Sequence, residues 1–413
     1  MFSPTCIINC QSTNFSNNIP KLTMKLQLSC LLFFFCSAVS AQDLRQPITV
    51  AAVPHGVFQH FEASGRTMMA VSQGTVGIVW EDNRSGQPQI YVAFKDRTAT
   101  VFTAPIQVSK NGPAYEPAIA ANKGHFIIGW EASDHLWLRS VSPHQQGPVI
   151  ALSKAAAHQL TLVATPQQTL AAAWGEHDGK NYSIHTAELI PLARSLRIEH
   201  RRAVDTSTDR NGEFYPTLTV TELGTAVAWE DRRQGATRIF TAFAPAGKAF
   251  EPYRVLNQFR YSVIRKYGNG TGAMRVVLSS DHKRNVMAIW LDKRDFVQGY
   301  DVYAAFSHDG GRTFAKDEKV QDPLGDNLPQ WHPTIAMSAK GRIAAAWDDS
   351  RDGTPDIWFS HRQQQQWQGD DVWPGGNGAG AQTQPVLIYE GETLHAAWLS
   401  QHEGKSAILY SQP

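Results

Sequence analysis

The sequence has no cysteine over most of its length and no strong charge of either sign. All four cysteines, Cys6, Cys10, Cys30 and Cys36, precede residue 42. The chain after that point therefore holds no disulfide, thiolate nucleophile or thiolate metal site. Lys and Arg number 38 against 37 Asp and Glu, a balance that excludes a polybasic nucleic-acid binder. An apolar share of 42% with 18% charged residues excludes a disordered chain.

The apolar run near the start is too short for a membrane span. It covers residues 26–35 after Met24-Lys25, and Val39-Ser40-Ala41 stands before Gln42. This order is typical of a secretory signal peptide, whereas a span needs about 20 apolar residues. We predict that residues 1–41 are an upstream extension and a signal peptide starting at Met24. Residues 42–413 would then form one secreted domain.

A tryptophan ends a short apolar run seven times, at intervals of 44 to 61 residues. These residues are Trp80, Trp130, Trp174, Trp229, Trp290, Trp347 and Trp398. A repeat of this length without helical periodicity indicates stacked sheet modules. We interpret the tryptophans as packing residues between modules, because each buries a large apolar area.

Each repeat contains four predicted strands. In several repeats a proline opens the first strand, as at Pro117, Pro216, Pro333 and Pro385, and the tryptophan ends the second. The last repeat ends after its third strand near Tyr410, and residues 47–50 resemble the fourth-strand sequence at 105–108. We therefore predict an all-β, seven-bladed β-propeller of four-stranded antiparallel blades, closed by an N-terminal strand. A six-bladed propeller is the alternative.

Residues 307–314, Ser-His-Asp-Gly-Gly-Arg-Thr-Phe, resemble the aspartate box of sialidase-type propellers, also called the BNR repeat. That motif closes the hairpin between the third and fourth strands of a blade. Asp309 supplies a side-chain cap, and Gly310-Gly311 permits the positive φ of a tight turn. The resemblance implies a propeller of the sialidase-like superfamily, whose six-bladed members are the alternative fold.

The first repeat is similar to a sialidase at two further points. Gly65-Arg66-Thr67-Met68 stands where the family has F-R-I-P, and the element from Trp80 to Arg84 stands where it has A-E-x-R. The resemblance implies that Arg66, with Arg84, binds the carboxylate of an acidic sugar through bidentate hydrogen bonds. Residues 85–89 hold no counterpart of the family's acid/base aspartate.

A W-x-D-x-R element recurs in four repeats. Its pairs are Asp82 and Arg84, Asp231 and Arg233, Asp292 and Arg294, and Asp349 and Arg351. Four similar copies favour a structural task that every blade shares, namely capping a turn with Asp and tying Arg to a neighbouring blade.

Residues that break the repeat are better candidates for ligand binding, because one ligand cannot require sevenfold sameness. Before the predicted first strands, at the channel mouth, stand Arg66, Glu116, Tyr215, Arg275, His332 and Gln384. Glu116 or Glu213 would activate Tyr215 as a nucleophile, as in sialidases. We expect Arg66 and Arg275 to point into one cavity, with Trp331 as a further substrate contact.

The connection at residues 258–272 contains Arg265 and Tyr267 before a glycine-rich end, which favours a lid over the channel. Arg265 is a candidate substrate ligand, and Tyr267 is an alternative nucleophile to Tyr215. No His or carboxylate cluster has metal-ligand spacing. We therefore expect neither a metal nor a cofactor.

Three functions fit these residues. The first is an exo-hydrolase of sialidase type that removes a terminal acidic sugar from an oligo- or polysaccharide. The second is a polysaccharide lyase, in which His332 and a tyrosine exchange the proton beside a uronate. The third is a non-catalytic scaffold that binds a carbohydrate or another partner. In each case we expect a secreted monomer.

Overall fold

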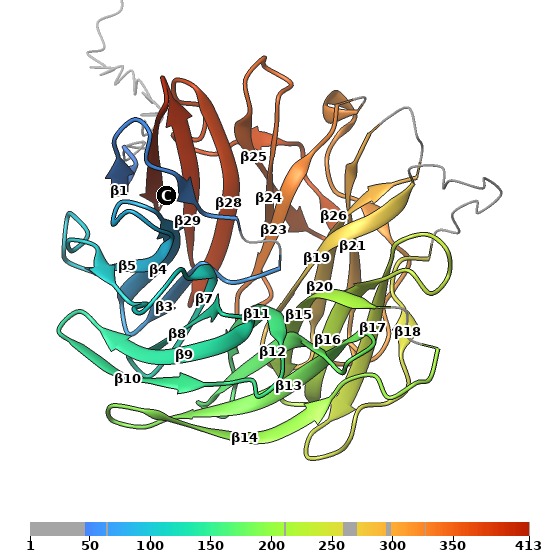
Figure 1. Ribbon diagram of the computed structural model, residues 1–413. Coiled ribbons are helices and arrows are strands. Elements are labelled where there is room, and N and C mark those ends of the chain that lie inside the picture. The colour runs from blue at the N-terminus through green and yellow to red at the C-terminus, as the bar shows by residue number, and fades with distance from the viewer. Residues whose placement is uncertain are drawn as a thin grey trace, which may run out of the picture. The chain divides into compact units, whose positions relative to one another are not determined.

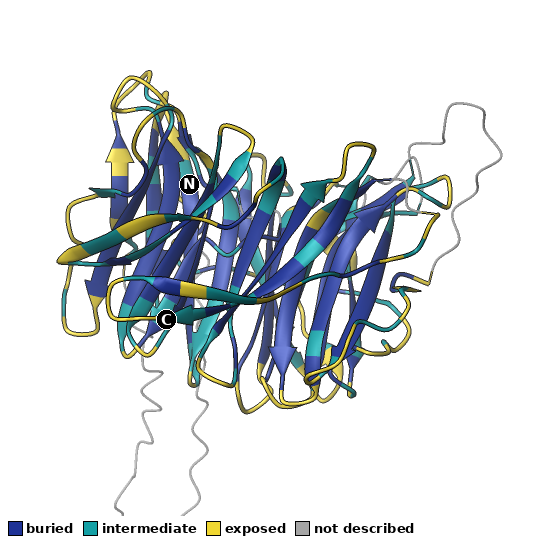
Figure 2. Ribbon diagram, turned by 60° about the horizontal axis from the view of Figure 1, so that its bottom comes forward, coloured by how far each residue is buried: buried dark blue, intermediate teal, exposed yellow. Residues whose placement is uncertain are grey.

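A computed structural model describes residues 46–62, 65–209, 212–258, 271–294, 299–326 and 328–412. These residues form seven antiparallel sheets arranged as a ring, the seven-bladed β-propeller that the tryptophan repeat predicts (Figure 1). Buried residues follow the strands and exposed residues gather in the turns (Figure 2). The predicted signal peptide lies outside the described residues. Within them, none of the helical structure has the length and hydropathy of a membrane span.

The blades are numbered here in chain order. Blade 1 contains β2 (Gln59–His60), β3 (Met69–Ser72), β4 (Thr75–Asp82), β5 (Gln89–Asp96) and β6 (Ile106–Gln107). Blade 2 contains β7 (Tyr115–Asn122), β8 (His125–Ala132), β9 (His135–Ser142) and β10 (Gln145–Ala151). Blade 3 contains β11 (Ala157–Ala164), β12 (Leu170–His177), β13 (Tyr182–Pro191) and β14 (Leu196–Ala203).

The second half of the chain repeats the pattern. Blade 4 contains β15 (Glu213–Thr221), β16 (Gly224–Asp231), β17 (Arg238–Pro245) and β18 (Arg254–Val255). Blade 5 contains β19 (Gly272–Ser280), β20 (Val286–Lys293), β21 (Asp301–Ser307) and β22 (Glu318–Lys319), followed by a 3-10 turn, η1 (Pro323–Gly325). Blade 6 contains β23 (Trp331–Met337), β24 (Ile343–Asp349), β25 (Asp356–Gln363), β26 (Gln366–Trp367) and β27 (Asp371–Val372). Blade 7 contains β28 (Ala381–Glu390), β29 (Thr393–His402), β30 (Lys405–Ser411) and β1 (Ile48–Val53).

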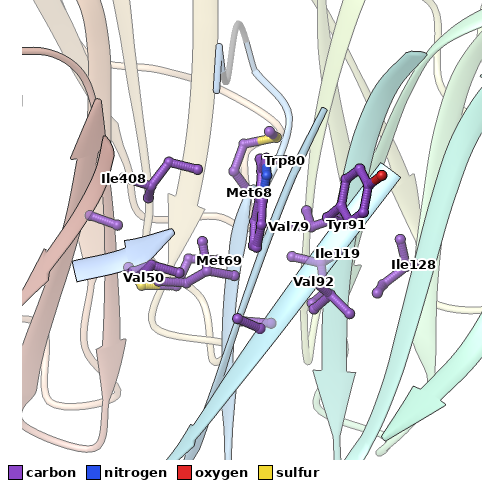
Figure 3. Close-up of a cluster of buried hydrophobic side chains, with 14 of the residues drawn as sticks. Val50, Met68, Met69, Val79, Trp80, Tyr91, Val92, Ile119, Ile128 and Ile408 are labelled. Atoms are coloured by element: carbon purple, nitrogen blue, oxygen red, sulfur yellow. The ribbon is translucent and has the colours of Figure 1, made fainter. Parts of the chain in front are cut away.

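The N-terminal strand closes the ring. β1 pairs antiparallel with β30, so that Ile48 lies opposite Tyr410 and Val53 opposite Ser406. The core at this closure joins Val50 of β1 and Ile408 of β30 to the buried Trp80 of blade 1 (Figure 3). The predicted fourth strand of the last blade is therefore confirmed. It covers the edge of β30 that would otherwise be open to pairing with another chain.

Removal of this strand should weaken the ring at its seam. We expect deletion of residues 42–53 to lower the melting temperature by about 5 °C or more and to promote association through the bared edge of β30. Calorimetry and size-exclusion chromatography would measure both effects. Deletion of residues 42–46 alone keeps β1 intact and is the control. An unchanged, monomeric 42–53 deletion would show that closure does not depend on β1.

The repeated Asp and Arg residues brace the blades. The Trp80 indole donates to Asp82 Oδ2 at 2.7 Å, as Trp290 does to Asp292 and Trp347 to Asp349. Each Arg then binds this Asp and lies over a third-strand ring, Tyr91 for Arg84, Phe240 for Arg233, Tyr303 for Arg294 and Trp358 for Arg351. In blade 3, Glu176 takes the place of the Asp, and Arg201 of β14 supplies the guanidinium. These contacts support a structural role. They lie within single blades, however, so the predicted tie of each Arg to a neighbouring blade is wrong for them.

Arg233 is the most enclosed of these arginines. Its side chain is 4% exposed and binds Asp231, Asp205 and Glu213 at 2.6, 2.8 and 3.0 Å. We expect Arg233→Ala to lower the free energy of unfolding by about 3 kcal/mol, because buried carboxylates lose their partner. Arg84, at 27% exposed, is the matched control, and Arg84→Ala should cost about 1 kcal/mol. Equal costs in denaturant titrations would contradict this ranking.

The turn at residues 307–313 joins β21 to β22, as the resemblance implies. Asp309 accepts hydrogen bonds from the Thr313 amide at 2.9 Å and its hydroxyl at 2.6 Å. Gly310 and Gly311 have φ values of 80° and 92°. A Cβ at Gly311 would lie 2.5 Å from the Ala226 side chain, so both conformation and space require glycine there.

Candidate functional site

Six inner strands bend at the same level near one end of the channel. In blades 2 to 7 the pairing of the first strand with the second shifts at a β-bulge. The bulged residue has a left-handed backbone in each case, with φ between 48° and 62°, and the six are Glu116, Gln159, Tyr215, Arg275, His332 and Gln384. Such conformations are uncommon away from glycine, and bulges next to functional sites redirect side chains. We call this end of the channel the bulge face.

Proline follows the bulged residue in four blades, at Pro117, Pro216, Pro333 and Pro385. The sequence predicted that these prolines open the strands, and that prediction is wrong. β7, for example, begins two residues earlier, at Tyr115. Proline is tolerated inside these strands because the bulge removes the ladder hydrogen bond that it cannot donate.

The bulges are held by the neighbouring blade. The backbone amide of Glu116 donates to Glu81 of blade 1 at 3.2 Å, and that of Arg275 donates to Glu230 of blade 4 at 2.7 Å. Glu131 accepts from Gln159, and Asp348 from Gln384, in the same way. In blade 3 the residue after the tryptophan is Gly175, which has no side chain to accept a hydrogen bond. The side chain of Gln159 in blade 3 instead accepts the hydrogen bond from the Tyr215 amide of blade 4, at 2.8 Å. In blades 2, 3, 5 and 7 the acidic residue after the preceding blade's strand-two tryptophan therefore fixes the bulge, and in blade 4 Gln159 does so.

Blade 1 departs from this pattern because its inner strand is interrupted between β2 and β3. The described residues 61–62 and 65–68 form a crossing segment that enters the middle of the ring (Figure 1). Thr67 donates to the carbonyl groups of Ile119 in blade 2 and Leu162 in blade 3 at 2.7 and 2.6 Å. A Cβ on Gly65 would stand 3.1 Å from the Val276 carbonyl oxygen of blade 5. The segment thus contacts blades on opposite sides of the channel.

The crossing segment separates two cavities. One, of about 230 Å³, lies along the channel and is lined by inner-strand residues with Gly65, Arg66 and Thr67. The other, of about 420 Å³, lies on the bulge face. We call it the bulge-face cavity, and it is lined by Glu62, Arg66, Glu116, Glu131, His158, Gln159, Tyr215, Glu230, Met274 and Arg275.

The two arginines of the cavity come from distant blades, and both line it. Arg66 forms an ion pair with Glu116, and Arg275 forms one with Glu62. Arg66 also donates to the Glu62 carbonyl oxygen at 3.0 Å. Glu131 binds His158 at 2.8 Å, an interaction that raises the pKa of the imidazole. Four glutamates therefore face two arginines and one histidine, and each arginine is already paired with a glutamate of the same chain.

Two groups of the cavity are strongly affected by burial. Burial raises the pKa of Glu230 from 4.5 to about 7. Burial also raises the pKa of the Tyr215 phenol, and the nearby Glu230 carboxylate adds to this effect. A raised phenol pKa opposes formation of a phenolate nucleophile. At neutral pH Glu230 is thus protonated in a large share of the molecules, whereas an ordinary glutamate is ionised, and Tyr215 keeps its proton.

The raised pKa of Glu230 has a consequence for stability. The folded state holds this proton more tightly than the unfolded chain, so the penalty of burying the charge is absent below about pH 4.5 and complete above about pH 7. Glu230→Gln removes this titration and can still accept the Arg275 amide. We compare the free energy of unfolding of the variant with that of the natural protein at each pH. This difference should be more favourable to the variant at pH 8 than at pH 5, by roughly 2 kcal/mol. Chemical denaturation at both pH values checks this, with the exposed Glu403→Gln as the control that should show no such change.

Several predicted site residues lie elsewhere. Glu213 is fully buried and accepts from the Ile184 amide at 2.8 Å while it binds Arg233, and burial raises its pKa to about 8. It is therefore placed to support the Arg233 cluster and does not line the cavity beside Tyr215. Arg84 braces blade 1 and is not a lining residue either. The candidates Arg265 and Tyr267 lie outside the described residues.

His332 and Trp331 stand at the bulge of blade 6, next to the cavity. His332 Nδ1 lies 2.7 Å from Asp348 Oδ1, and the same carboxylate accepts the Gln384 amide. Trp331 packs against Tyr300 with ring centroids 5.4 Å apart. Neither residue is among those that line the bulge-face cavity.

The sequence prediction missed Glu62, Glu131, Glu230 and Gln159. Two of them carried a signal, because an acidic residue follows the repeat tryptophan at Glu131 and Glu230, as it does at Glu81 and Asp348. Gln159 lacks the proline that marks four other bulges, and Glu62 belongs to the interrupted strand. Gln159 therefore occupies the repeated bulge position without its proline signal, and Glu62 lies outside the repeat.

No protein-family model matches the sequence, and no curated protein matches it. Solved structures do share its architecture. A Dyadobacter fermentans protein of unknown function has 9% identity and a TM-score of 0.52, with 89% of this chain and 98% of that one covered. An α-L-arabinanase of Penicillium chrysogenum, solved with arabinobiose, has 10% identity and a TM-score of 0.51 over 89% and 98%.

A puromycin-hydrolyzing peptidase of Mycobacterium tuberculosis is also similar, with 11% identity and a TM-score of 0.50. The match covers 84% of this chain and 52% of the peptidase, so this chain spans about half of that protein. At these identities the likeness shows the propeller fold alone. A glycosidase and a peptidase on one fold mean that function must be argued from the site.

Proposed function

We propose that the protein is a glycoside hydrolase that removes a terminal sugar from a glycan in the bulge-face cavity. Glu230 is the general acid, and Glu116 is the nucleophile or base. One observation carries the proposal: a buried carboxyl group with a pKa of about 7 shares a cavity with a carboxylate that is ion-paired with Arg66. Two carboxyl groups in contrasting environments are what acid-assisted glycosidic cleavage needs.

The positions of the two groups support these roles. Glu230 is the last residue but one of β16 in blade 4, whereas Glu116 stands at the bulge of blade 2. They therefore approach a bound sugar from different parts of the ring. Tyr215 is the bulged residue of β15 in blade 4. Its raised phenol pKa suits a hydrogen-bond donor better than a nucleophile.

The charges favour a neutral sugar over the acidic one predicted from the sequence. A substrate carboxylate would compete with Glu62 and Glu116 for the two guanidinium groups and would face Glu131 and Glu230 as well. The full-length likeness to an arabinanase is in keeping with a neutral glycan. A polymer outside the cell suits the predicted signal peptide.

The lyase hypothesis receives less support. A lyase requires a base that removes the proton from the carbon next to the carboxylate of the uronate. His332 binds Asp348 and is not among the residues that line the cavity. Proton removal at a uronate would also place one more negative charge beside four glutamates.

Incubation with a panel of glycans tests the proposal. Arabino-oligosaccharides, arabinan, sialyllactose and oligogalacturonate separate neutral, sialylated and uronate substrates, and mass analysis identifies the products. We expect a released neutral monosaccharide, and activity that falls as the pH rises through about 7, because Glu230 then loses its proton. Glu230→Gln and Glu116→Gln should each lower kcat by about 100-fold or more.

Glu213→Gln is the matched control. It replaces a buried carboxyl group that lies away from the cavity, so its activity should remain near that of the natural protein at a temperature where it is folded. Release of sialic acid would restore the acidic-sugar hypothesis, and an unsaturated uronate product would establish a lyase. Binding without any product would identify a non-catalytic scaffold.

A further inference from the structure

Exposed aromatic side chains gather on the bulge face. Among the large apolar residues that the structure describes as exposed, the aromatic ones are Phe58, Tyr115, Tyr215 and Trp331. Tyr215 lines the cavity, while Tyr115 and Trp331 directly precede the bulged Glu116 and His332. Phe58 stacks on His60, which lies 3.5 Å from Glu62 and 3.9 Å from Glu116. Tyr215 is thus the one that lines the cavity, and the other three are next to, or in contact with, residues at the same end of the channel.

Trp331 of blade 6 forms an aromatic pair with Tyr300 of blade 5. Its ring centroid lies 5.4 Å from that of Tyr300, and the two rings are tilted by 52°. The ammonium group of Lys293, at the end of β20, lies 5.6 Å from the centroid of the Tyr300 ring. Burial raises the pKa of Tyr300, and Glu230 and Arg275 act on it as well. Both of these charged residues line the cavity, and Trp331 directly precedes the bulged His332 at the same end of the channel.

An aromatic pair in this place suits one kind of ligand. A sugar ring offers C–H groups on its faces and hydroxyl groups around its rim, so its face packs on an indole while its rim binds polar neighbours. Trp331 is 37% exposed although it lies against Tyr300. A sugar above it would cover apolar surface that the protein itself leaves in water.

We propose that Trp331 and Tyr300 form a second sugar-binding subsite, which packs against the sugar next to the one held in the bulge-face cavity. This inference rests on the proposed function for the role of the cavity. It names the substrate class as an oligosaccharide or polysaccharide, since a small glycoside would leave the aromatic pair uncovered. Hydrolysis should therefore depend on the length of the glycan.

Binding without turnover tests the subsite. The natural chain, Glu230→Gln and Trp331→Ala are first applied to a glycan array to find sugars that bind. Sugars of one to four residues that are retained are then titrated by calorimetry into Glu230→Gln and into the double variant that also carries Trp331→Ala. We expect Trp331→Ala to weaken binding of disaccharides and longer chains about tenfold and to leave the monosaccharide unaffected. Trp331→Phe should recover most of the affinity. Leu324→Ala, at an apolar residue 82% exposed in the same connection, should change nothing.

The outcomes separate this inference from the proposed function. Equal effects of Trp331→Ala on monosaccharides and longer chains, or no effect, overturn the subsite while hydrolysis stands. A selective loss of oligosaccharide binding, in a protein that cleaves no glycan of the panel, supports the subsite and overturns the proposed function. If Glu230→Gln retains no sugar on the array and the natural chain releases no product from the glycan panel, both are wrong.

Discussion

The site depends on a strained backbone residue that the preceding blade helps to hold in blades 2, 3, 4, 5 and 7. A left-handed residue at Glu116 or Arg275 is unfavourable by itself, and the neighbouring carboxylate stabilises it by accepting its amide. Two of these carboxylates, Glu131 and Glu230, then line the cavity. One set of hydrogen bonds thus joins the blades and places acidic groups where a ligand would bind.

The crossing segment adds the second constraint. A propeller channel is open at both ends unless something fills it, and here residues of blade 1 contact blades 2, 3 and 5 across the middle. The bulge-face cavity consequently has a floor that carries Arg66 and Glu62, each bonded to a residue of another blade. A closed floor suits the end of a glycan chain better than a chain that passes through.

The sequence predicted the fold well because the fold is repetitive. Seven tryptophans and a proline-led strand at Pro47 were enough to number the blades and to pair β1 with β30. The residues at the channel mouth were found because they break that repetition, as Tyr215 and Arg275 do. Glu62 could not be found in this way, because its position depends on a segment that leaves its own blade and meets Arg275 far along the chain. Glu213 was misplaced because the alternation of a strand does not reveal which neighbour, here Arg233, will take up a buried carboxyl group.

Closure by β1 also bears on how the chain folds. The pairing of Ile48 with Tyr410 joins two ends of the sequence, so blade 7 cannot be completed until the last strand has been made. Contacts of such long range carry a high loop-closure cost and slow the folding of β proteins. Blades 1 to 6 consist of strands that are neighbours in sequence and can form during synthesis, which leaves the seam between β1 and β30 as the slow final step.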